Sequence, residues 1–334
     1  MTAGRIFITR RIPDAGIELL RSTGADITIG QENDERGIAT DALLAGILAA
    51  DVLLALLTER IDLAILSANP RLRGIANYAV GVDNIDVDAA TRLGIPVSNT
   101  PGVLTEATAD LTFALVLAAA RRVCEAHAYT LDGRYRIWGP RLLLGADIGP
   151  GPDGRRKTFG IIGFGRIGKE MARRGTGFGM RLLAHDEYED NAAAKEIGVT
   201  FTSLEELLQQ SDFVSLHCTL TPETHCLIGA EQLAMMKPSA ILINAARGPV
   251  VDTDALVDAL RNGTIWAAGL DVTDPEPLPQ DHPLVSLSNC IVVPHIASGT
   301  IATRNEMARL AVENCLAVLN GITPPHCVNP EVLE

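Results

Sequence analysis

The chain has 334 residues, of which 47% are hydrophobic and 21% are charged, so it is long enough for two domains that each bury a core. Its formal net charge of −13 argues against nucleic acid or an anionic membrane as a partner, but a local arginine could still bind a small anionic substrate. The six cysteines contain no C-x-x-C pair, which favours free thiols in a reducing cytoplasm and gives no reason to expect a bound metal.

The first hundred residues alternate between strand and helix patterns. The short apolar run Ile6–Ile8 has charged residues on both sides, which is typical of a first strand and not of a signal peptide. A helical pattern follows at residues 14–22. Four short strands are expected at residues 5–9, 52–56, 72–79 and 95–98.

Asn99-Thr100-Pro101-Gly102 breaks this pattern, and a long helix is expected from about residue 105 to residue 123. The apolar stretch 111–120 within it is too short to cross a bilayer, which favours a buried helix and no membrane partner. The glycine- and proline-rich segment 145–156 then predicts an exposed loop.

Gly163-Phe164-Gly165-Arg166-Ile167-Gly168 follows the apolar run 158–162 and precedes a helical pattern. The continuous apolar run predicts a parallel strand that is covered on both faces. Gly163 would allow a tight turn, Gly165 would leave room for a pyrophosphate, and Gly168 would let the helix pack on the sheet. The phosphates would meet the unpaired N–H groups of the first helical turn, so the six residues predict a dinucleotide site.

Asp186 ends the next predicted strand, residues 181–186, and lies eighteen residues after the last glycine of the loop. A carboxylate at this place accepts hydrogen bonds from a ribose 2′-hydroxyl and repels a 2′-phosphate. Glu187 adds to the repulsion, and no arginine or lysine follows before Lys195. The sequence therefore predicts NAD(H) in preference to NADP(H).

The fold class predicted from these patterns is α/β, with two doubly wound Rossmann-like domains. A cofactor domain at residues 100–296 would be inserted into a split substrate domain, residues 1–99 and 297–334. The two crossings of the chain would create a hinge and a cleft. A last helix is expected at residues 305–319. The cofactor sheet would contain six strands, at residues 158–162, 181–186, 213–217, 240–244, 267–272 and 291–293.

Arg247 lies three residues after the end of the predicted strand 240–244. It would therefore lie at the carboxyl end of a parallel strand, where ligands of open α/β sheets bind. A guanidinium suits bidentate binding of a substrate carboxylate. Taken alone, Arg247 could equally be a surface or helix-capping residue.

Glu276 and His295 follow the next two predicted strands. A histidine exchanges protons near neutral pH, so His295 is a candidate proton donor for a forming alkoxide. A carboxylate beside an imidazole favours the protonated form of the ring, so Glu276 is a candidate partner. Each residue alone is more commonly a hydrogen-bonded core histidine or a solvated carboxylate. Three such groups at the ends of three successive strands would converge, and this favours a catalytic set with Arg247.

Five further segments accompany the glycine loop in a fixed order: Asn77–Asp86, Thr108–Asp110, Asn244–Gly248, Gly269–Val272 and Pro294–Ile296. Together the six segments resemble the D-isomer-specific 2-hydroxyacid dehydrogenases, and the similarity extends from about Arg5 to Val328. Asn77–Gly81 and Leu270–Pro279 are most similar to the glyoxylate/hydroxypyruvate reductases within that family.

The resemblance implies a role for each candidate residue. Arg247 and the backbone N–H groups of Val80 and Gly81 would bind the substrate carboxylate. His295 would act as general acid, and Glu276 would orient and charge it. Family members are usually homodimers, and the long helix from residue 105 would form much of the interface. The remaining cofactor contacts would come from Thr108 and Asp271 at the nicotinamide end and from the backbone of Cys218 and Ala245.

The chain departs from the family pattern at four places. Thr219 stands where a proline is familiar after His-Cys, and Ala297 stands where a glycine follows the catalytic histidine. Leu142 stands where many relatives carry a second aromatic residue, and the loop Gly149–Arg156 looks longer than usual. Substrate selection is the property that these departures affect most.

The sequence as a whole predicts an NADH-dependent enzyme that reduces glyoxylate or hydroxypyruvate to the D-2-hydroxy acid. Oxidation of D-3-phosphoglycerate, or of another D-2-hydroxy acid, is an alternative within the enzyme class, although no second cation near Val80 can be assigned to a phosphate. An NAD(H)-sensing binding protein that resembles transcriptional corepressors is an alternative from another class. Turnover on a small 2-oxo acid distinguishes the two classes.

Overall fold

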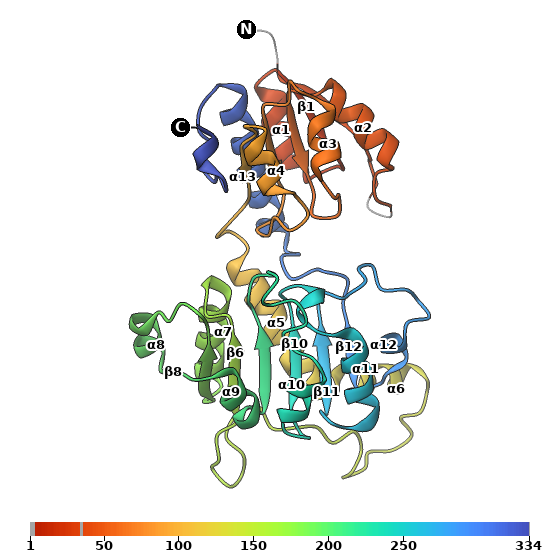
Figure 1. Cartoon of the computed structure of the whole chain (residues 1–334). Helices are drawn as coiled ribbons and strands as arrows, with labels where there is room; N and C mark the ends of the chain where they lie inside the picture. Colours follow the sequence, from red (N-terminus) through yellow and green to blue (C-terminus); the bar gives the residue numbers. More distant parts are fainter. Residues whose placement is uncertain (1–3, 34–35, 334) are drawn as a thin grey trace. The chain divides into compact units, whose positions relative to one another are not determined.

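The computed structural model describes residues 4–33 and 36–333, and the chain forms two compact units. The first unit comprises Met1–Leu104 and Gly299–Glu334, and the second comprises Thr105–Ser298. The chain therefore passes between the units twice, at residues 104/105 and 298/299 (Figure 1). The sequence places these boundaries slightly earlier, at 99/100 and 296/297.

The first unit contains a five-stranded parallel sheet with helices on its faces (Figure 1). Its strands are β1 (Arg5–Ile8), β2 (Asp26–Ile29), β3 (Val52–Ala55), β4 (Gly74–Asn77) and β5 (Val97–Ser98). They lie in the order β2-β1-β3-β4-β5, and β3 and β4 are fully buried because both sheet faces are covered. The helices are α1 (Asp14–Ser22), α2 (Thr40–Ala49), α3 (Leu63–Ala68), α4 (Val87–Arg92) and α13 (Ile301–Leu319), with a short 3₁₀ turn η2 (Pro330–Leu333).

Helix α13 explains why the C-terminal segment belongs to the first unit. It packs against α1, β3 and β4, and Met307, Ala311 and Cys315 on its inner face are buried. The guanidinium of Arg73 also donates to the carbonyl oxygen of Val318 at 3.0 Å. The sheet therefore needs both ends of the chain to complete its core.

The second unit is built on a seven-stranded parallel sheet in the order β12-β11-β10-β9-β6-β7-β8. Helices lie on both of its faces, and one apolar cluster fills each side. The strands are β6 (Thr158–Ile162), β7 (Arg181–His185), β8 (Val199–Phe201), β9 (Phe213–Leu216), β10 (Ile241–Asn244), β11 (Ala267–Leu270) and β12 (Cys290–Val292). The helices are α5 (Thr105–Ala120), α6 (Val123–Leu131), α7 (Arg166–Gly177), α8 (Asn191–Ile197), α9 (Leu204–Gln210), α10 (Ala230–Met235), α11 (Thr253–Asn262) and α12 (Pro283–Ser286), with a 3₁₀ turn η1 (Gly248–Val250).

The predicted fold class is confirmed, because both sheets are parallel and interleaved with helices. Two strands were not expected from the sequence. Both β2 and β8 are edge strands with polar residues between apolar ones, so their apolar runs are short. The cofactor sheet therefore has seven strands in place of the predicted six.

The predicted helix over residues 105–123 was too long. Helix α5 ends at Ala120, and the next helix begins at Val123. Arg122 between them has a left-handed backbone with φ of 53°, and its guanidinium pairs with Glu125 at 2.7 Å. The sequence pattern did not reveal this break, because an arginine carries no signal for a left-handed backbone.

Candidate active site

The glycine loop joins β6 to α7 at the carboxyl edge of the second sheet. Gly163 has a φ of 91°, and a Cβ atom there would overlap the backbone nitrogen of Cys218, so the turn requires glycine. At Gly165, the residue before α7, no other atom would lie within 4 Å of a Cβ atom. The first turn of α7 therefore has open space in front of its unpaired N–H groups, which fits a pyrophosphate. Of the remaining loop residues, Phe164 and Gly168 are buried, Ile167 is half-buried and Arg166 is exposed.

Asp186 lies directly beside this loop. Its Oδ2 atom accepts a hydrogen bond from the backbone N–H of Phe164 at 2.5 Å, and its Oδ1 atom accepts one from Tyr188 at 2.8 Å. The nearby cation Lys169 is paired with Asp190 at 2.6 Å. The side chains that follow Asp186 are acidic or aromatic and exposed, so the surroundings of the carboxylate are negative.

The segment after β9 closes the loop from the other side. Burial raises the pKa of the Cys218 thiol to about 11, so the thiol stays protonated and contributes no charge near the glycines. Burial lowers the pKa of His217 to about 3, and its Nε2 atom lies 2.8 Å from the hydroxyl of Ser215. His217 is therefore neutral at pH 7. After Thr219, the hydroxyl of Thr224 closes a turn by donating to the Thr219 carbonyl at 2.6 Å.

Arg247 follows β10 and is held by the side chain of Asn244. The Asn244 amide nitrogen donates to the Arg247 carbonyl at 2.9 Å, and its oxygen accepts from the N–H of Ala246 at 3.0 Å. A Cβ atom on Gly248 would overlap the carbonyl oxygen of Thr273. The backbone after Arg247 thus passes directly against the loop that carries Glu276, and Ala245 is half-buried between these fixed points.

Glu276 and His295 form a hydrogen-bonded pair. The Nδ1 atom of His295 lies 2.6 Å from the Oε1 atom of Glu276, and the two side chains are 23% and 34% exposed. Burial alone would raise the pKa of Glu276, but the hydrogen bond and charge of His295, with help from the Thr273 N–H and Arg247, lower it overall. The ionised carboxylate therefore accepts the Nδ1 proton, and Nε2 remains as the nitrogen that can exchange a proton with a substrate.

Asp271 fixes the backbone around His295. This residue is only 1% exposed, and its carboxylate accepts hydrogen bonds from the N–H groups of Ile296 at 2.7 Å and Ala297 at 3.0 Å. Its own carbonyl accepts from the N–H of His295 at 2.9 Å. His295 adopts a left-handed backbone, with φ of 52°, under these constraints. Burial raises the pKa of Asp271, and the two N–H groups and the His295 charge oppose this rise.

Thr108 lies in the second turn of α5 and is 4% exposed. Its carbonyl accepts a hydrogen bond from the hydroxyl of Thr112 at 2.6 Å. Helix α5 packs against β10 and β11, the two strands that lead to Arg247 and Glu276. At the other end of α5, the Ala120 carbonyl accepts from Ala146, so the first turns of α5 point toward the carboxyl edge of the sheet.

In the first unit, Val80 and Gly81 follow β4. The N–H of Thr100 donates to the Ala79 carbonyl at 2.9 Å, and the side chain of Asn99 donates to the Val80 carbonyl at 2.7 Å. Because each carbonyl shares a rigid peptide plane with the next N–H, these bonds fix the directions of the Val80 and Gly81 N–H groups. Asn77 holds the Gly81 carbonyl at 2.8 Å in the same way.

Asn244, Asn77 and Asp271 hold the candidate site residues in place, and this role was not predicted from the sequence. Asn244 and Asn77 each end an apolar strand with a polar side chain, and both are nearly fully buried. A buried amide at the end of an apolar run must find hydrogen-bond partners. An asparagine at this position could therefore have been predicted to fix the backbone of the loop that follows. Asp271 was expected only as a cofactor contact, and its bonds to Ile296 and Ala297 depend on folding.

A cavity of about 430 Å³ lies at the opposite edge of the second sheet. It is lined by residues just before β6, β9, β10 and β11, among them Lys157, Asp212 and Trp266. Open α/β sheets bind ligands at the carboxyl ends of their strands, so this cavity is separate from the catalytic set. Among the residues that the structure describes, no cluster of three His, Cys, Asp or Glu could hold a metal ion. Within the same residues, no helix is long and apolar enough to span a bilayer.

The chain is similar to known proteins over nearly its whole length. The family model for "D-isomer specific 2-hydroxyacid dehydrogenase, NAD binding domain" matches residues 113–297. A glyoxylate reductase of Thermococcus kodakarensis is 48% identical over 334 residues, which covers 99% of this chain and 97% of the relative. A glyoxylate reductase of Korarchaeum cryptofilum is 46% identical, with 99% of this chain and 97% of the relative covered.

Solved structures show the same similarity. A protein from Thermus thermophilus has a TM-score of 0.89 and 47% identity, and covers 97% of this chain and 99% of its own. An NADPH-dependent glyoxylate/hydroxypyruvate reductase from Sinorhizobium meliloti, solved in complex with NADP and malonate, has a TM-score of 0.83 and 30% identity. That match covers 98% of this chain and 97% of the reductase.

Proposed function

The chain belongs to the D-isomer specific 2-hydroxyacid dehydrogenase family and is an oxidoreductase, and from this premise we propose that it reduces glyoxylate and hydroxypyruvate with NADH. The product of hydroxypyruvate reduction would be the D-2-hydroxy acid. The observation that carries the proposal is the hydrogen-bonded pair of Glu276 and His295 at the carboxyl edge of a sheet that also carries Arg247 and the glycine loop.

His295 would act as the general acid. Its Nδ1–H is held by the Glu276 carboxylate, so the ring is oriented with Nε2 available for proton transfer. When the reduced nicotinamide is bound, it supplies the hydride that adds to the carbonyl carbon. His295 would deliver the proton from Nε2 to the carbonyl oxygen as negative charge develops there. Asp271 keeps the ring from shifting, because it anchors Ile296 and Ala297.

The substrate carboxylate would bind to Arg247 and to the N–H groups of Val80 and Gly81. A guanidinium offers two parallel donors to a carboxylate, and backbone N–H groups at a fixed angle add further donors. Arg247 is already held at its carbonyl by Asn244, and the two peptide planes are held by Thr100 and Asn99. Orientation of this kind supplies on the order of 7–11 kcal/mol when the reacting groups are aligned.

The cofactor that we propose is NADH in preference to NADPH. The glycine loop and Asp186 would hold the dinucleotide, with Thr108, Cys218, Ala245 and Asp271 as further contacts. Asp186 already accepts a hydrogen bond from the loop at Phe164, so its carboxylate lies at the rim of the site. A 2′-phosphate there would meet this charge and that of Glu187. The reductase of Sinorhizobium meliloti uses NADPH, so cofactor choice varies among similar proteins.

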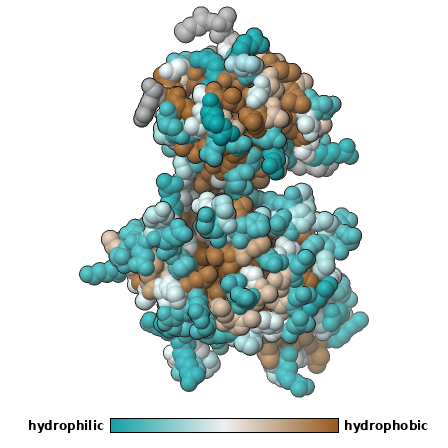
Figure 2. Space-filling model, viewed as in Figure 1, coloured by the Kyte–Doolittle hydropathy of each residue, from teal (hydrophilic) through white to brown (hydrophobic). Residues whose placement is uncertain are grey.

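We also propose that the enzyme is a cytoplasmic homodimer. Helix α6 buries none of its residues within the chain, and the segment after it exposes large apolar side chains. Figure 2 shows hydrophobic residues at the lower end of the second unit. A second copy would cover these side chains. The six cysteines are all unpaired, in keeping with a reducing compartment. The exposed residues are Val123, Leu131, Tyr135, Ile137, Trp138 and Leu144.

An absorbance assay at the reduced-nicotinamide band tests the proposed reaction. Purified protein would be offered NADH or NADPH with glyoxylate, hydroxypyruvate, pyruvate and 3-phosphohydroxypyruvate. Fast loss of NADH with either of the first two acids is the expected result. Preference for 3-phosphohydroxypyruvate would replace the proposed substrate, and preference for NADPH would overturn the argument from Asp186.

A further inference from the structure

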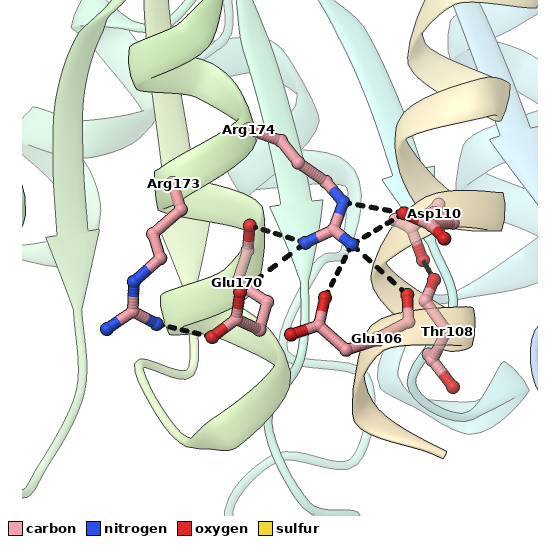
Figure 3. A network of polar contacts seen from close by, with 7 residues as sticks. Glu106, Thr108, Asp110, Glu170, Arg173 and Arg174 are labelled. Carbon is pink, nitrogen blue, oxygen red and sulfur yellow. Dashed lines mark hydrogen bonds and ion pairs between the residues drawn. The ribbon is translucent and has the colours of Figure 1, made fainter. Parts of the chain in front are cut away.

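Helix α7, which starts at the glycine loop, is tied to helix α5 by one arginine. Figure 3 shows the guanidinium of Arg174 pointing from α7 toward Glu106 and Asp110 on α5. Its Nε and Nη2 atoms donate to Asp110 Oδ1 at 3.0 and 2.5 Å, and Nη2 also donates to Glu106 Oε2 at 2.8 Å. Its Nη1 atom donates to the carbonyl of Glu170 at 3.0 Å. Three nitrogens of one planar group are thus engaged on two helices.

Arg174 binds the first two turns of α5 and not its middle. Glu106 and Asp110 are four residues apart, so they lie on one face of the first two turns. Thr108 lies between them in sequence and on the opposite side of the helix, where it is 4% exposed. Any rotation or shift of these turns relative to α7 would therefore move Thr108 as well.

The start of α5 is packed through Thr108 and Ala109 on its buried side, and Arg174 holds its exposed side. Helix α5 is the first element of the second unit, and the residue before it belongs to the first unit. Its carboxylates at Glu106 and Asp110 are 70% exposed, whereas the Arg174 side chain is 20% exposed. A half-buried, planar donor that binds two residues at once fixes an orientation better than a single flexible surface ion pair does.

We infer that Arg174 is a positioning residue: it holds the first two turns of α5 against α7 and so sets the place of Thr108 beside the nicotinamide half of the bound cofactor. The inference rests on the proposed function, in which the glycine loop holds the pyrophosphate and Thr108 contacts the nicotinamide end. Arg174 itself would touch neither substrate nor cofactor. Its contacts would link the pyrophosphate site at the start of α7 to the nicotinamide site at Thr108.

This role predicts that two related ligands respond differently. ADP-ribose contains the adenine, ribose and pyrophosphate parts of NADH but lacks the nicotinamide. In the full-length variant Arg174→Gln, NADH should bind about tenfold more weakly, because Thr108 is no longer held in register. ADP-ribose should bind within about twofold of its affinity for the wild type, because α7 and Asp186 are unchanged. Arg174→Lys keeps the charge but cannot engage both carboxylates in one plane, so it should restore NADH affinity only in part.

The chain provides a matched control on the same helix. Arg173 pairs with Glu170 within α7, and its side chain is 46% exposed and points away from α5 (Figure 3). Arg173→Gln removes the same charge one residue away and should leave both affinities unchanged. Should Arg174→Gln fold poorly, Asp110→Ala and Glu106→Ala remove the acceptors at exposed positions and should together reproduce the NADH effect.

The outcomes separate this inference from the proposed function. Equal weakening of NADH and ADP-ribose in Arg174→Gln would show that the arginine supports α7 as a whole, and would overturn the inference. So would unchanged NADH affinity. Wild-type protein that binds NADH but does not reduce glyoxylate or hydroxypyruvate would overturn the proposed reaction while leaving the ligand comparison valid. Wild-type protein that binds neither ligand would overturn both.

Discussion

The imidazole of His295 and the carboxylate of Glu276 meet at 2.6 Å, although the two residues follow different strands and are nineteen residues apart. Glu276 follows β11 and His295 follows β12, which are neighbours in the sheet. The pairing therefore depends on parallel strands that end at one edge. Arg247, after the neighbouring strand β10, contributes to the lowered pKa of Glu276, so its charge acts on the same group.

Replacing Glu276 with glutamine should lower kcat for glyoxylate about a hundredfold with a smaller change in KM, because the amide neither charges nor orients the imidazole as well. Steady-state kinetics at pH 7 measures this effect. A fall in kcat/KM caused only by a higher KM would contradict the role of Glu276 as the partner of the proton donor His295.

The same variant should change how stability depends on pH. The pKa of Glu276 is lowered from its ordinary 4.5, so its folded-state value lies below its unfolded-state value. The stabilisation from the pair is therefore fully present above the ordinary carboxyl pKa and is lost as the pH falls through the lowered value. Denaturant unfolding between pH 7 and pH 3 should show a constant wild-type advantage over Glu276→Gln that shrinks below about pH 4.5. An advantage that grows on acidification would reverse the assigned direction of the shift.

Arg247 and His295 should separate binding from turnover. Arg247→Lys should raise the KM for the oxo acid about tenfold or more, because a lysine lacks the planar pair of donors. His295→Asn should lower kcat at least about a hundredfold with little change in the KM. NADH affinity, measured by fluorescence, serves as the control and should stay near the wild-type value in both. Equal kinetic defects in the two variants would argue against distinct roles.

Asp186 should set the choice of dinucleotide. Asp186→Ala should raise the KM for NADH about tenfold and lower that for NADPH, because the ribose acceptor and the charge that repels a 2′-phosphate are both removed. The ratio of kcat/KM for the two cofactors measures the change. Glu189→Ala is a useful comparison, since it removes an exposed carboxylate three residues away. An unchanged cofactor ratio in Asp186→Ala would refute the sequence argument for NAD(H).

Gly248 should tolerate no side chain. A Cβ atom there would overlap the Thr273 carbonyl, so Gly248→Ala should displace the loop that carries Glu276. We expect a loss of about 2 kcal/mol in the free energy of unfolding and a lower kcat. Gly177→Ala is the control, because its Cβ atom would have no neighbour within 4 Å, and its effect on stability should stay within about 1 kcal/mol. Equal stability of the two variants would mean that the loops can separate at little cost.

The sequence was sufficient for the fold class because most strands of the second unit are unbroken apolar runs. The run 158–162 and the loop after it correspond directly to β6 and the start of α7. Edge strands such as β8 were missed because one side of an edge strand is open and its apolar run is short. The left-handed residue Arg122 was missed because an arginine carries no signal for positive φ.

The candidate site could be predicted only in part. Residues that follow strands, such as Arg247 and His295, can be located by counting along the chain. The bonds that fix them join distant segments: Asp271 binds residues 296 and 297, and Arg174 binds Asp110 across 64 positions. Such partners depend on how helices and loops pack, which no local pattern records.

The position of His295 has a consequence for recombination among relatives. The residue lies three positions before the second crossing between the units, yet Asp271 holds the two residues that follow it. The proposed proton donor, its carboxylate partner and the glycine loop therefore all lie within the second unit. A chimera that takes Met1–Leu104 and Gly299–Glu334 from another family member would exchange Val80 and Gly81, the proposed carboxylate contacts of the first unit. The second unit, Thr105–Ser298, would be unchanged in this chimera.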